Sequence, residues 1–176
     1  VFDVAGGSGH VSLALSMLGV CSTVVDPREN VGRLPKRDRK VYNNALVYCQ
    51  EMVPYQTTRA WFGSPPNGVD KSFRTPDQAS VPILDDECLQ NATALVALHP
   101  DEATEVVVDM AIRYKIPFLS VPCCVFFRFF PQRRKRNGDA VSTHADLIEY
   151  LQDKHTSIQT TVLPFEGANT ILWSHF

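Results

Sequence analysis

The stretch VFDVAGGSGH, residues 1–10, joins a short apolar run to a cluster of small residues and then to a helical pattern. Residues 1–4 are typical of a buried strand, and the apolar residues that recur from Val11 to Leu18 indicate a helix. A strand, a glycine loop and a helix in this order direct unpaired N–H groups and the positive end of a helix dipole into one cleft. The stretch therefore predicts either a loop that binds a polar or anionic ligand, or a sharp turn alone.

Two carboxylates favour the ligand-binding interpretation. Asp3 lies inside the apolar strand, where an unpaired carboxylate is costly, so we expect a hydrogen-bond donor or a cationic ligand group beside it. Asp26 ends a second apolar run, STVVDPR (residues 22–28). It follows the glycine loop by roughly 20 residues, the spacing at which a carboxylate accepts hydrogen bonds from the two hydroxyls of a nucleoside ribose. We therefore predict a ligand that contains adenosine.

Strand-like and helix-like stretches alternate along the rest of the chain. After the first two strands, we expect further strands within residues 57–63, 93–100, 116–124 and 157–176, and helices within 39–53, 101–115 and 142–155. Thr143 and Asp146 match a capping box at the start of the last helix. This alternation predicts an α/β, Rossmann-like three-layer sandwich: a mostly parallel, seven-stranded sheet that ends in a C-terminal antiparallel hairpin whose turn is residues 165–168. Residues 64–90 are predicted to be an irregular insertion.

Composition places few limits on function. With 176 residues, 44% hydrophobic, 20% charged and a formal charge of −2, we expect one domain over residues 1–176 with no global bias toward nucleic acid. No apolar run reaches the roughly 20 residues of a membrane span. The five cysteines have no metal-binding spacing, which predicts reduced thiols, no metal site and an intracellular protein of the cytoplasm or mitochondrion. Because a central strand needs cover on both faces, we expect either a preceding N-terminal segment or a protein partner to cover residues 1–4.

Several motifs resemble those of class I S-adenosylmethionine-dependent methyltransferases. DVAGGSG (residues 3–9) is similar to the first motif of that superfamily, VVDP (24–27) to its second, and the terminal hairpin to its reversed seventh strand. ALHPDEAT (97–104) followed by VPCC (121–124) resembles a narrower group that includes the eukaryotic tRNA ribose methyltransferases. A nicotinamide-dependent dehydrogenase would share the glycine loop, but it would leave Asp3 and the final hairpin unexplained.

The resemblance implies that S-adenosylmethionine is the cofactor, and it indicates which residues bind it. The expected cofactor-binding residues are Asp3, Ala5, Gly6, Gly7, Ser8, Gly9, Asp26, Pro27, Phe62 and His99. On the acceptor side, His99 either orients or deprotonates an acceptor hydroxyl or caps the following helix. Cys123 and Cys124 either contact the substrate or pack as small buried residues.

The segment FFRFFPQRRKRNG (residues 126–138) follows the fifth predicted strand and is strongly basic. Arginines and lysines interleaved with phenylalanines bind nucleic acid through phosphates and base stacking, or else form a solvated loop. The predicted RNA contacts are Arg128, Arg133, Arg134, Lys135 and Arg136. We therefore predict an S-adenosylmethionine-dependent methyltransferase that acts on RNA. The alternative is a methyltransferase fold with weak or no catalysis that serves as a scaffold in a ribonucleoprotein.

Overall fold

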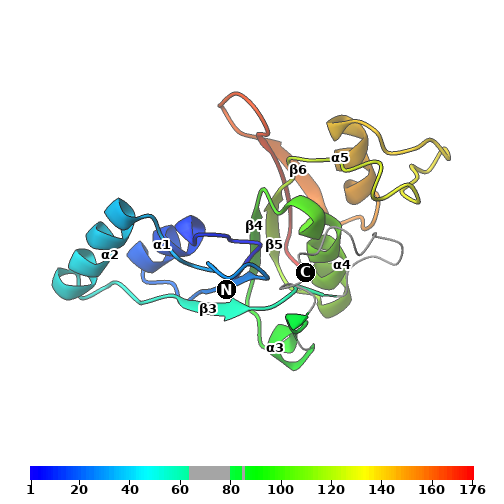
Figure 1. Cartoon of the computed structure of the whole chain (residues 1–176). Coiled ribbons are helices and arrows are strands. Elements are labelled where there is room, and N and C mark those ends of the chain that lie inside the picture. Colours follow the sequence, from blue (N-terminus) through cyan, green and yellow to red (C-terminus); the bar gives the residue numbers. More distant parts are fainter. Residues whose placement is uncertain (64–79, 85) are drawn as a thin grey trace.

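The structure is a computed structural model that describes residues 1–63, 80–84 and 86–176. Its seven strands form one sheet in the order β3-β2-β1-β4-β5-β7-β6 (Figure 1). The strands are β1 (Phe2–Val4), β2 (Thr23–Asp26), β3 (Gln56–Arg59), β4 (Leu95–Leu98), β5 (Phe118–Val121), β6 (Gln159–Val162) and β7 (Thr170–Ser174). Neighbouring strands from β3 to β5 are parallel, whereas β7 runs antiparallel to both β5 and β6. The predicted Rossmann-like fold with its reversed strand is confirmed.

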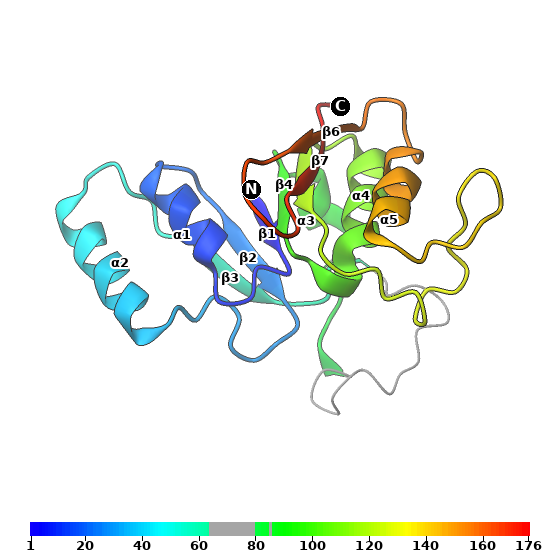
Figure 2. The same cartoon turned by 90° about the horizontal axis from the view of Figure 1, so that it is seen from above.

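Four of the helices lie in two groups, one beside each half of the sheet. The helices are α1 (His10–Met17), α2 (Lys36–Tyr48), α3 (Asp86–Gln90), α4 (Thr104–Tyr114) and α5 (His144–Gln152), with a 3-10 turn at Asp101–Ala103. Figures 1 and 2 show α1 and α2 beside the β1–β3 half, and α4 and α5 beside the β4–β7 half. Within the described residues, no helix has the length and apolar character that a membrane crossing requires.

The order of the strands reverses between β1 and β4, which are neighbours in the sheet. Asp3 of β1 lies opposite Val24 of β2 on one side and Val96 of β4 on the other. In open α/β sheets, ligands bind outside the carboxyl ends of the strands at such a reversal. The topology therefore directs attention to the loops that follow β1, β2, β4 and β5.

The main apolar core lies between the sheet and α4 and α5. Val107, Val108, Leu147, Leu151 and Leu172 are all 0% exposed and belong to one cluster. The opposite face of the same strands is less covered, since Leu98 of β4 is 44% exposed and Leu119 of β5 is 36% exposed. The two faces of the β4–β5 part of the sheet are thus unequally buried.

The predicted helix over residues 39–53 is shifted in the structure, where α2 spans Lys36–Tyr48. Of the apolar positions that suggested it, Val41 is 62% exposed and Cys49 is also exposed. Tyr42, which was not among those positions, is buried. The Tyr42 hydroxyl accepts a hydrogen bond from the Tyr55 amide at 3.1 Å, and the two rings lie 5.0 Å apart. Tyr42 is the one buried residue of α2, so the helix has no apolar stripe, which is why periodicity located it imprecisely.

Other boundaries differ in smaller ways. The strand predicted over 57–63 is β3, Gln56–Arg59, and residues 86–90 of the predicted irregular insertion form the short helix α3. The rest of that insertion, residues 64–79 and 85, lies outside the described residues. The capping box is confirmed: the Thr143 hydroxyl accepts from the Asp146 amide, and the Asp146 carboxylate accepts from the Thr143 amide.

Candidate functional site

Asp3 is fully buried beneath the glycine loop and holds the start of α1. Its Oδ2 accepts hydrogen bonds from the Ser12 amide at 3.0 Å and from the Ser12 hydroxyl at 2.9 Å. Ser12 is in the first turn of α1, so Asp3 supplies the cap that Gly9, the N-cap residue, lacks. The expected donor beside Asp3 is therefore Ser12. Because Asp3 is 0% exposed, it positions the loop and the helix and does not itself line a cleft.

The second carboxylate oxygen of Asp3 has no hydrogen-bond partner. Burial raises the pKa of Asp3, and the hydrogen bonds from Ser12 lower it only in part. A raised pKa means that the folded state favours the protonated form. Stability contributed by this group is present at low pH and is lost as the pH rises through the raised pKa.

We therefore expect an Asp3→Asn variant to be at least as stable as the wild type at neutral pH. Asparagine keeps an oxygen for Ser12 and cannot ionise, so it removes the cost of a buried charge. Urea unfolding of both proteins between about pH 4 and about pH 8 measures this, and the stability of the wild type should fall relative to the variant as the pH rises. A relative gain of the wild type with rising pH would instead mean that the ionised carboxylate is stabilised.

The glycine loop lies in close contact with its surroundings. A Cβ on Gly6 would stand 2.5 Å from the Asp3 carboxyl carbon, so only glycine lets the loop lie directly on that carboxylate. Gly7 has a φ of 54°, in the left-handed region, and its carbonyl accepts a hydrogen bond from the Gly32 amide at 2.7 Å. Among the described residues, the N–H groups of Gly6 and Ser8 have no protein acceptor. The loop therefore offers free donors beside the start of α1, as a polar ligand group requires.

Asp26 ends β2 with its carboxylate against the glycine loop. Its Oδ2 accepts a hydrogen bond from the Gly7 amide at 3.0 Å, so the predicted ribose-binding carboxylate and the predicted loop meet. The Arg28 side chain also binds this carboxylate through two bonds, Nε to Oδ1 at 2.8 Å and Nη2 to Oδ2 at 2.6 Å. As a result Asp26 is only 1% exposed.

Arg28 is a site residue that the sequence analysis did not identify. Its paired N–H groups occupy the two carboxylate oxygens that the two hydroxyls of a ribose would use. The pKa of Arg28 is raised, first by its hydrogen bonds to Asp26 and then by the charges of Asp26, Asp101 and Glu102. The guanidinium therefore interacts with negative charges that follow both β2 and β4. The Arg28 side chain is 58% exposed.

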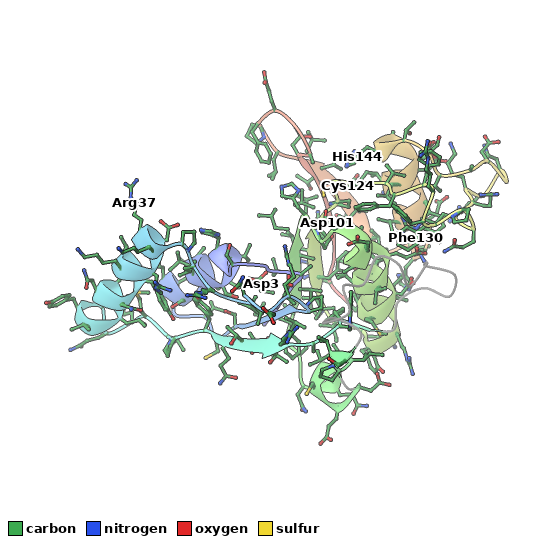
Figure 3. All side chains as sticks on the ribbon, viewed as in Figure 1. Asp3, Arg37, Asp101, Cys124, Phe130 and His144 are labelled. Atoms are coloured by element: carbon green, nitrogen blue, oxygen red, sulfur yellow. The ribbon has the colours of Figure 1, made fainter. Side chains whose placement is uncertain are left out.

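The residues after β4 and β5 meet at the same edge of the sheet. The His99 amide donates to the Val121 carbonyl at 3.0 Å, which joins the two strand ends. The His99 side chain is exposed, and the Cys123 thiol donates a hydrogen bond to Oδ1 of Asp101 at 3.5 Å. Figure 3 shows Asp101, Cys124 and His144 grouped near the starts of α4 and α5, whereas Arg37 lies far away on α2.

Cys123 is a poor nucleophile in this environment. Burial, together with the neighbouring Cys124 thiol and the Asp101 carboxylate, raises its pKa to about 12. A thiolate is the reactive form of cysteine, and at neutral pH this thiol is protonated. The ring Nε2 of His144 lies 3.0 Å from the Pro122 carbonyl oxygen, so it faces the backbone that leads into the two cysteines.

Four residues without glycine's freedom adopt left-handed backbone at this edge. Ala5, His99, Asp101 and Phe126 have φ values between 47° and 54°, and they follow β1, β4 and β5. Among the described non-glycine residues, Lys115 at the end of α4 is the remaining one with positive φ. Such conformations cost energy and persist where the surrounding structure imposes them.

Phe62 and Arg133 take structural positions that differ from their predicted roles. Phe62 is 6% exposed and belongs to the apolar core. Arg133 is 2% exposed, and its Nε donates to Oε2 of Glu105 on α4 at 2.7 Å. An arginine buried in this way is unavailable to RNA, so the prediction for Arg133 is wrong. Nothing in the sequence indicates this burial, because the ion-pair partner of Arg133 lies 28 residues away.

The other basic residues of residues 126–138 remain at the surface, but most have protein partners. Lys135 pairs with Asp146 and Glu149, and Arg136 pairs with Asp153. Arg134 donates to two backbone carbonyls, and Arg128 lies over the Phe127 ring. Ion pairs with acidic residues on and after α5, and hydrogen bonds to its own backbone, therefore hold most of the basic side chains of this segment. It presents less unpaired positive charge than its composition suggests.

Comparisons with known proteins show likeness of fold only. No protein-family model and no curated protein matches the sequence. Among solved structures, a SAM-dependent methyltransferase of Methanosarcina mazei has 13% identity and a TM-score of 0.42, with 99% of this chain and 92% of that chain covered. The magnesium protoporphyrin IX methyltransferase of Synechocystis PCC 6803, solved with bound SAH, has 13% identity and a TM-score of 0.49, with 99% and 73% covered. Similarity at this level identifies neither a family nor a ligand.

Proposed function

We propose that this chain is a methyltransferase that binds S-adenosylmethionine at the carboxyl edge of its sheet. The observation that carries the proposal is the hydrogen bond between the Gly7 amide and Asp26, which brings a bare loop and a strand-end carboxylate into one site. The donor set fits the cofactor: the free N–H groups of Gly6 and Ser8 suit its amino-acid end, and Asp26 suits its ribose diol. When bound, the cofactor supplies an electrophilic methyl group on a sulfonium.

The protein's own contribution to methyl transfer would be mainly positioning. Alignment of an acceptor with a bound methyl group supplies about 7–11 kcal/mol without any dedicated base. His99, exposed at the end of β4, is placed to orient an acceptor hydroxyl or to accept its proton. Asp3 acts through the loop and α1 and does not touch the ligand.

Arg28 must move if a ribose is to bind Asp26. The exchange replaces one pair of hydrogen bonds by another, and the exposed position of the Arg28 side chain lets water solvate the displaced guanidinium. We infer that Arg28 competes with the cofactor for Asp26 and occupies this carboxylate in the free protein.

An Arg28→Ala variant is expected to bind S-adenosylmethionine about 2- to 5-fold more tightly than the wild type. The Arg28 side chain is 58% exposed, so water solvates it once it leaves Asp26, and the ion pair that the ribose replaces contributes about 1 kcal/mol or less. Calorimetric titration measures both affinities, with Arg37→Ala, an exposed arginine of α2, as the matched control. Weaker binding by Arg28→Ala would show that the guanidinium contacts the cofactor and does not compete with it.

RNA is the acceptor class that we propose. The support is local positive charge: Arg33, Lys36 and Arg39 line a hollow of about 420 Å³ together with Asn30, Leu34 and Pro35. This hollow adjoins the site, because Gly32 of the same loop donates to the Gly7 carbonyl. Phosphate groups favour such clusters of arginine and lysine. Transfer of a tritiated methyl group to total RNA, with total protein as the parallel substrate, tests the acceptor class.

A second candidate function has one observation in its favour. Because Arg28 fills both oxygens of Asp26, the fold could serve as a scaffold in a ribonucleoprotein with the cofactor site closed. Calorimetry separates the two candidates. Binding of S-adenosylmethionine by the wild type and the Arg28→Ala variant supports the enzyme, and absence of binding in both supports the scaffold.

A further inference from the structure

Three side chains with metal-binding atoms converge beyond β4 and β5. Asp101 follows β4, while Cys123 and Cys124 follow β5, and one oxygen and the two sulfurs all lie within 4.8 Å of one another. The strands bring them together, because Leu98 lies opposite Val121 in parallel register. Asp101 is 22 residues from Cys123, which explains why cysteine spacing alone predicted no metal site.

We propose that Asp101, Cys123 and Cys124 bind one thiophilic divalent cation of the zinc class. In tetrahedral zinc sites with Zn–S of about 2.3 Å and Zn–O of about 2.0 Å, a sulfur and an oxygen ligand are about 3.5 Å apart. Oδ1 of Asp101 and Sγ of Cys123 lie 3.5 Å apart. Two sulfur ligands of such an ion are about 3.8 Å apart. The two cysteine sulfurs of this cluster lie within 4.8 Å of each other, which is compatible with that distance.

The chemistry of the three ligands selects the class of metal. Thiolates favour zinc and its thiophilic relatives, and they disfavour magnesium and calcium, which prefer all-oxygen sites. Asp101 is available as a ligand, because no described cationic side chain forms an ion pair with it. Metal binding releases the protons of both thiols, so two thiolates and a carboxylate together supply three negative charges to a divalent ion.

Three protein ligands leave the fourth tetrahedral position open for water or for another small ligand. Zinc sites of this kind are typical of catalytic centres, whereas purely structural sites have four protein ligands. The cluster lies at the edge of the sheet where we place the acceptor, close to His99 at the end of β4. Metal binding does not depend on the proposed methyl transfer, so failure of one proposal leaves the other unaffected.

Cobalt is the probe for this site, because its thiolate charge-transfer and d–d absorption report ligand type and geometry. The full chain is reduced, freed of metal with a chelator and titrated with CoCl₂ under nitrogen. We expect one cobalt ion per chain, absorption typical of tetrahedral thiolate coordination, and displacement of the cobalt by one equivalent of zinc. Absence of thiolate-to-cobalt absorption in the wild type would overturn the proposal.

Variants assign the ligands. Cys124→Ser and Cys123→Ser should each weaken cobalt binding by at least about 10-fold and reduce the charge-transfer intensity, and Asp101→Asn should weaken it by about 10- to 100-fold. Cys21→Ser and Cys49→Ser, at exposed cysteines outside the cluster, are the matched controls and should bind as the wild type does. Circular dichroism confirms that each variant is folded. Loss of the spectrum in a control variant but not in Cys124→Ser would also overturn the assignment.

Discussion

An Arg133→Ala variant is expected to lose about 3 kcal/mol of unfolding free energy, the low end of the range for breaking a buried ion pair. Arg133 is 2% exposed, and its guanidinium binds Glu105 at 2.7 Å and the Val125 carbonyl at 3.0 Å. It also lies over the Phe130 ring, 3.7 Å from the centroid. The alanine variant leaves the Glu105 carboxylate with less compensation and leaves a cavity beside Phe130.

The loss should stay at the low end because Glu105 keeps two other partners. Lys154 donates to Oε1 of Glu105 at 2.8 Å, and the Tyr150 hydroxyl donates to the same oxygen. Burial alone would raise the pKa of Glu105, but the bonds from Lys154, Tyr150 and Arg133 lower it below its ordinary value. The stability linked to this group is therefore present at neutral pH and is lost as the pH falls through the lowered pKa.

Urea unfolding at neutral pH measures the effect of Arg133→Ala. The control is Arg136→Ala, which removes an arginine that is 74% exposed in its pair with Asp153 and should cost less than about 1 kcal/mol. A double variant, Arg133→Met with Glu105→Gln, should recover part of the loss because it removes the carboxylate charge that Arg133 compensates. Equal stabilities of Arg133→Ala and Arg136→Ala would contradict a buried, stabilising pair.

The second large effect is expected on cofactor affinity. An Asp26→Ala variant should bind S-adenosylmethionine about 10- to 150-fold more weakly than the wild type, because it loses charge-assisted hydrogen bonds worth about 1.5–3 kcal/mol. The Gly7 amide, which donates to Asp26 at 3.0 Å, would also lose its acceptor, so the loop itself would be held less firmly.

Calorimetry measures this affinity, and a melting curve confirms that the variant is folded. Asp26→Asn, which keeps the size of the side chain and removes its charge, separates electrostatics from loop geometry. Asp38→Asn is the control, since Asp38 lies on α2 and pairs with His10 at the surface. If Asp26→Ala bound the cofactor as tightly as the wild type, the placement of the ribose would be wrong.

The sequence predicts the centre of the sheet well because β2, β4 and β5 are local apolar runs, whereas β3 and β6 at its edges are largely polar. Short-range patterns of neighbouring residues predict the alternation of strands and helices, the reversed final strand, and the capping box at Thr143 and Asp146. All three are present in the structure. The meeting of the glycine loop with Asp26 was likewise predicted, since strand ends in a parallel sheet share one edge.

Side-chain pairing over long distances in sequence was not predictable in this way. A run of arginines and lysines appeared to be one basic surface, yet Arg133 is buried against Glu105 on another element. Arg28 is only two residues from Asp26, but nothing in the sequence indicates that its side chain folds back on that carboxylate. Phe62 is an aromatic residue at a strand end, where core and ligand-binding positions have the same pattern.

The left-handed backbone at Ala5, His99, Asp101 and Phe126 also affects how this protein could be made resistant to heat. Each such residue costs roughly 1–2 kcal/mol that glycine would not. Directed evolution toward a higher melting temperature would therefore select glycine at these four positions. The large core side chains are already fully buried and offer less to improve. The glycines would make the loops after β1, β4 and β5 more flexible, so thermal stability would rise while affinity for a ligand would fall.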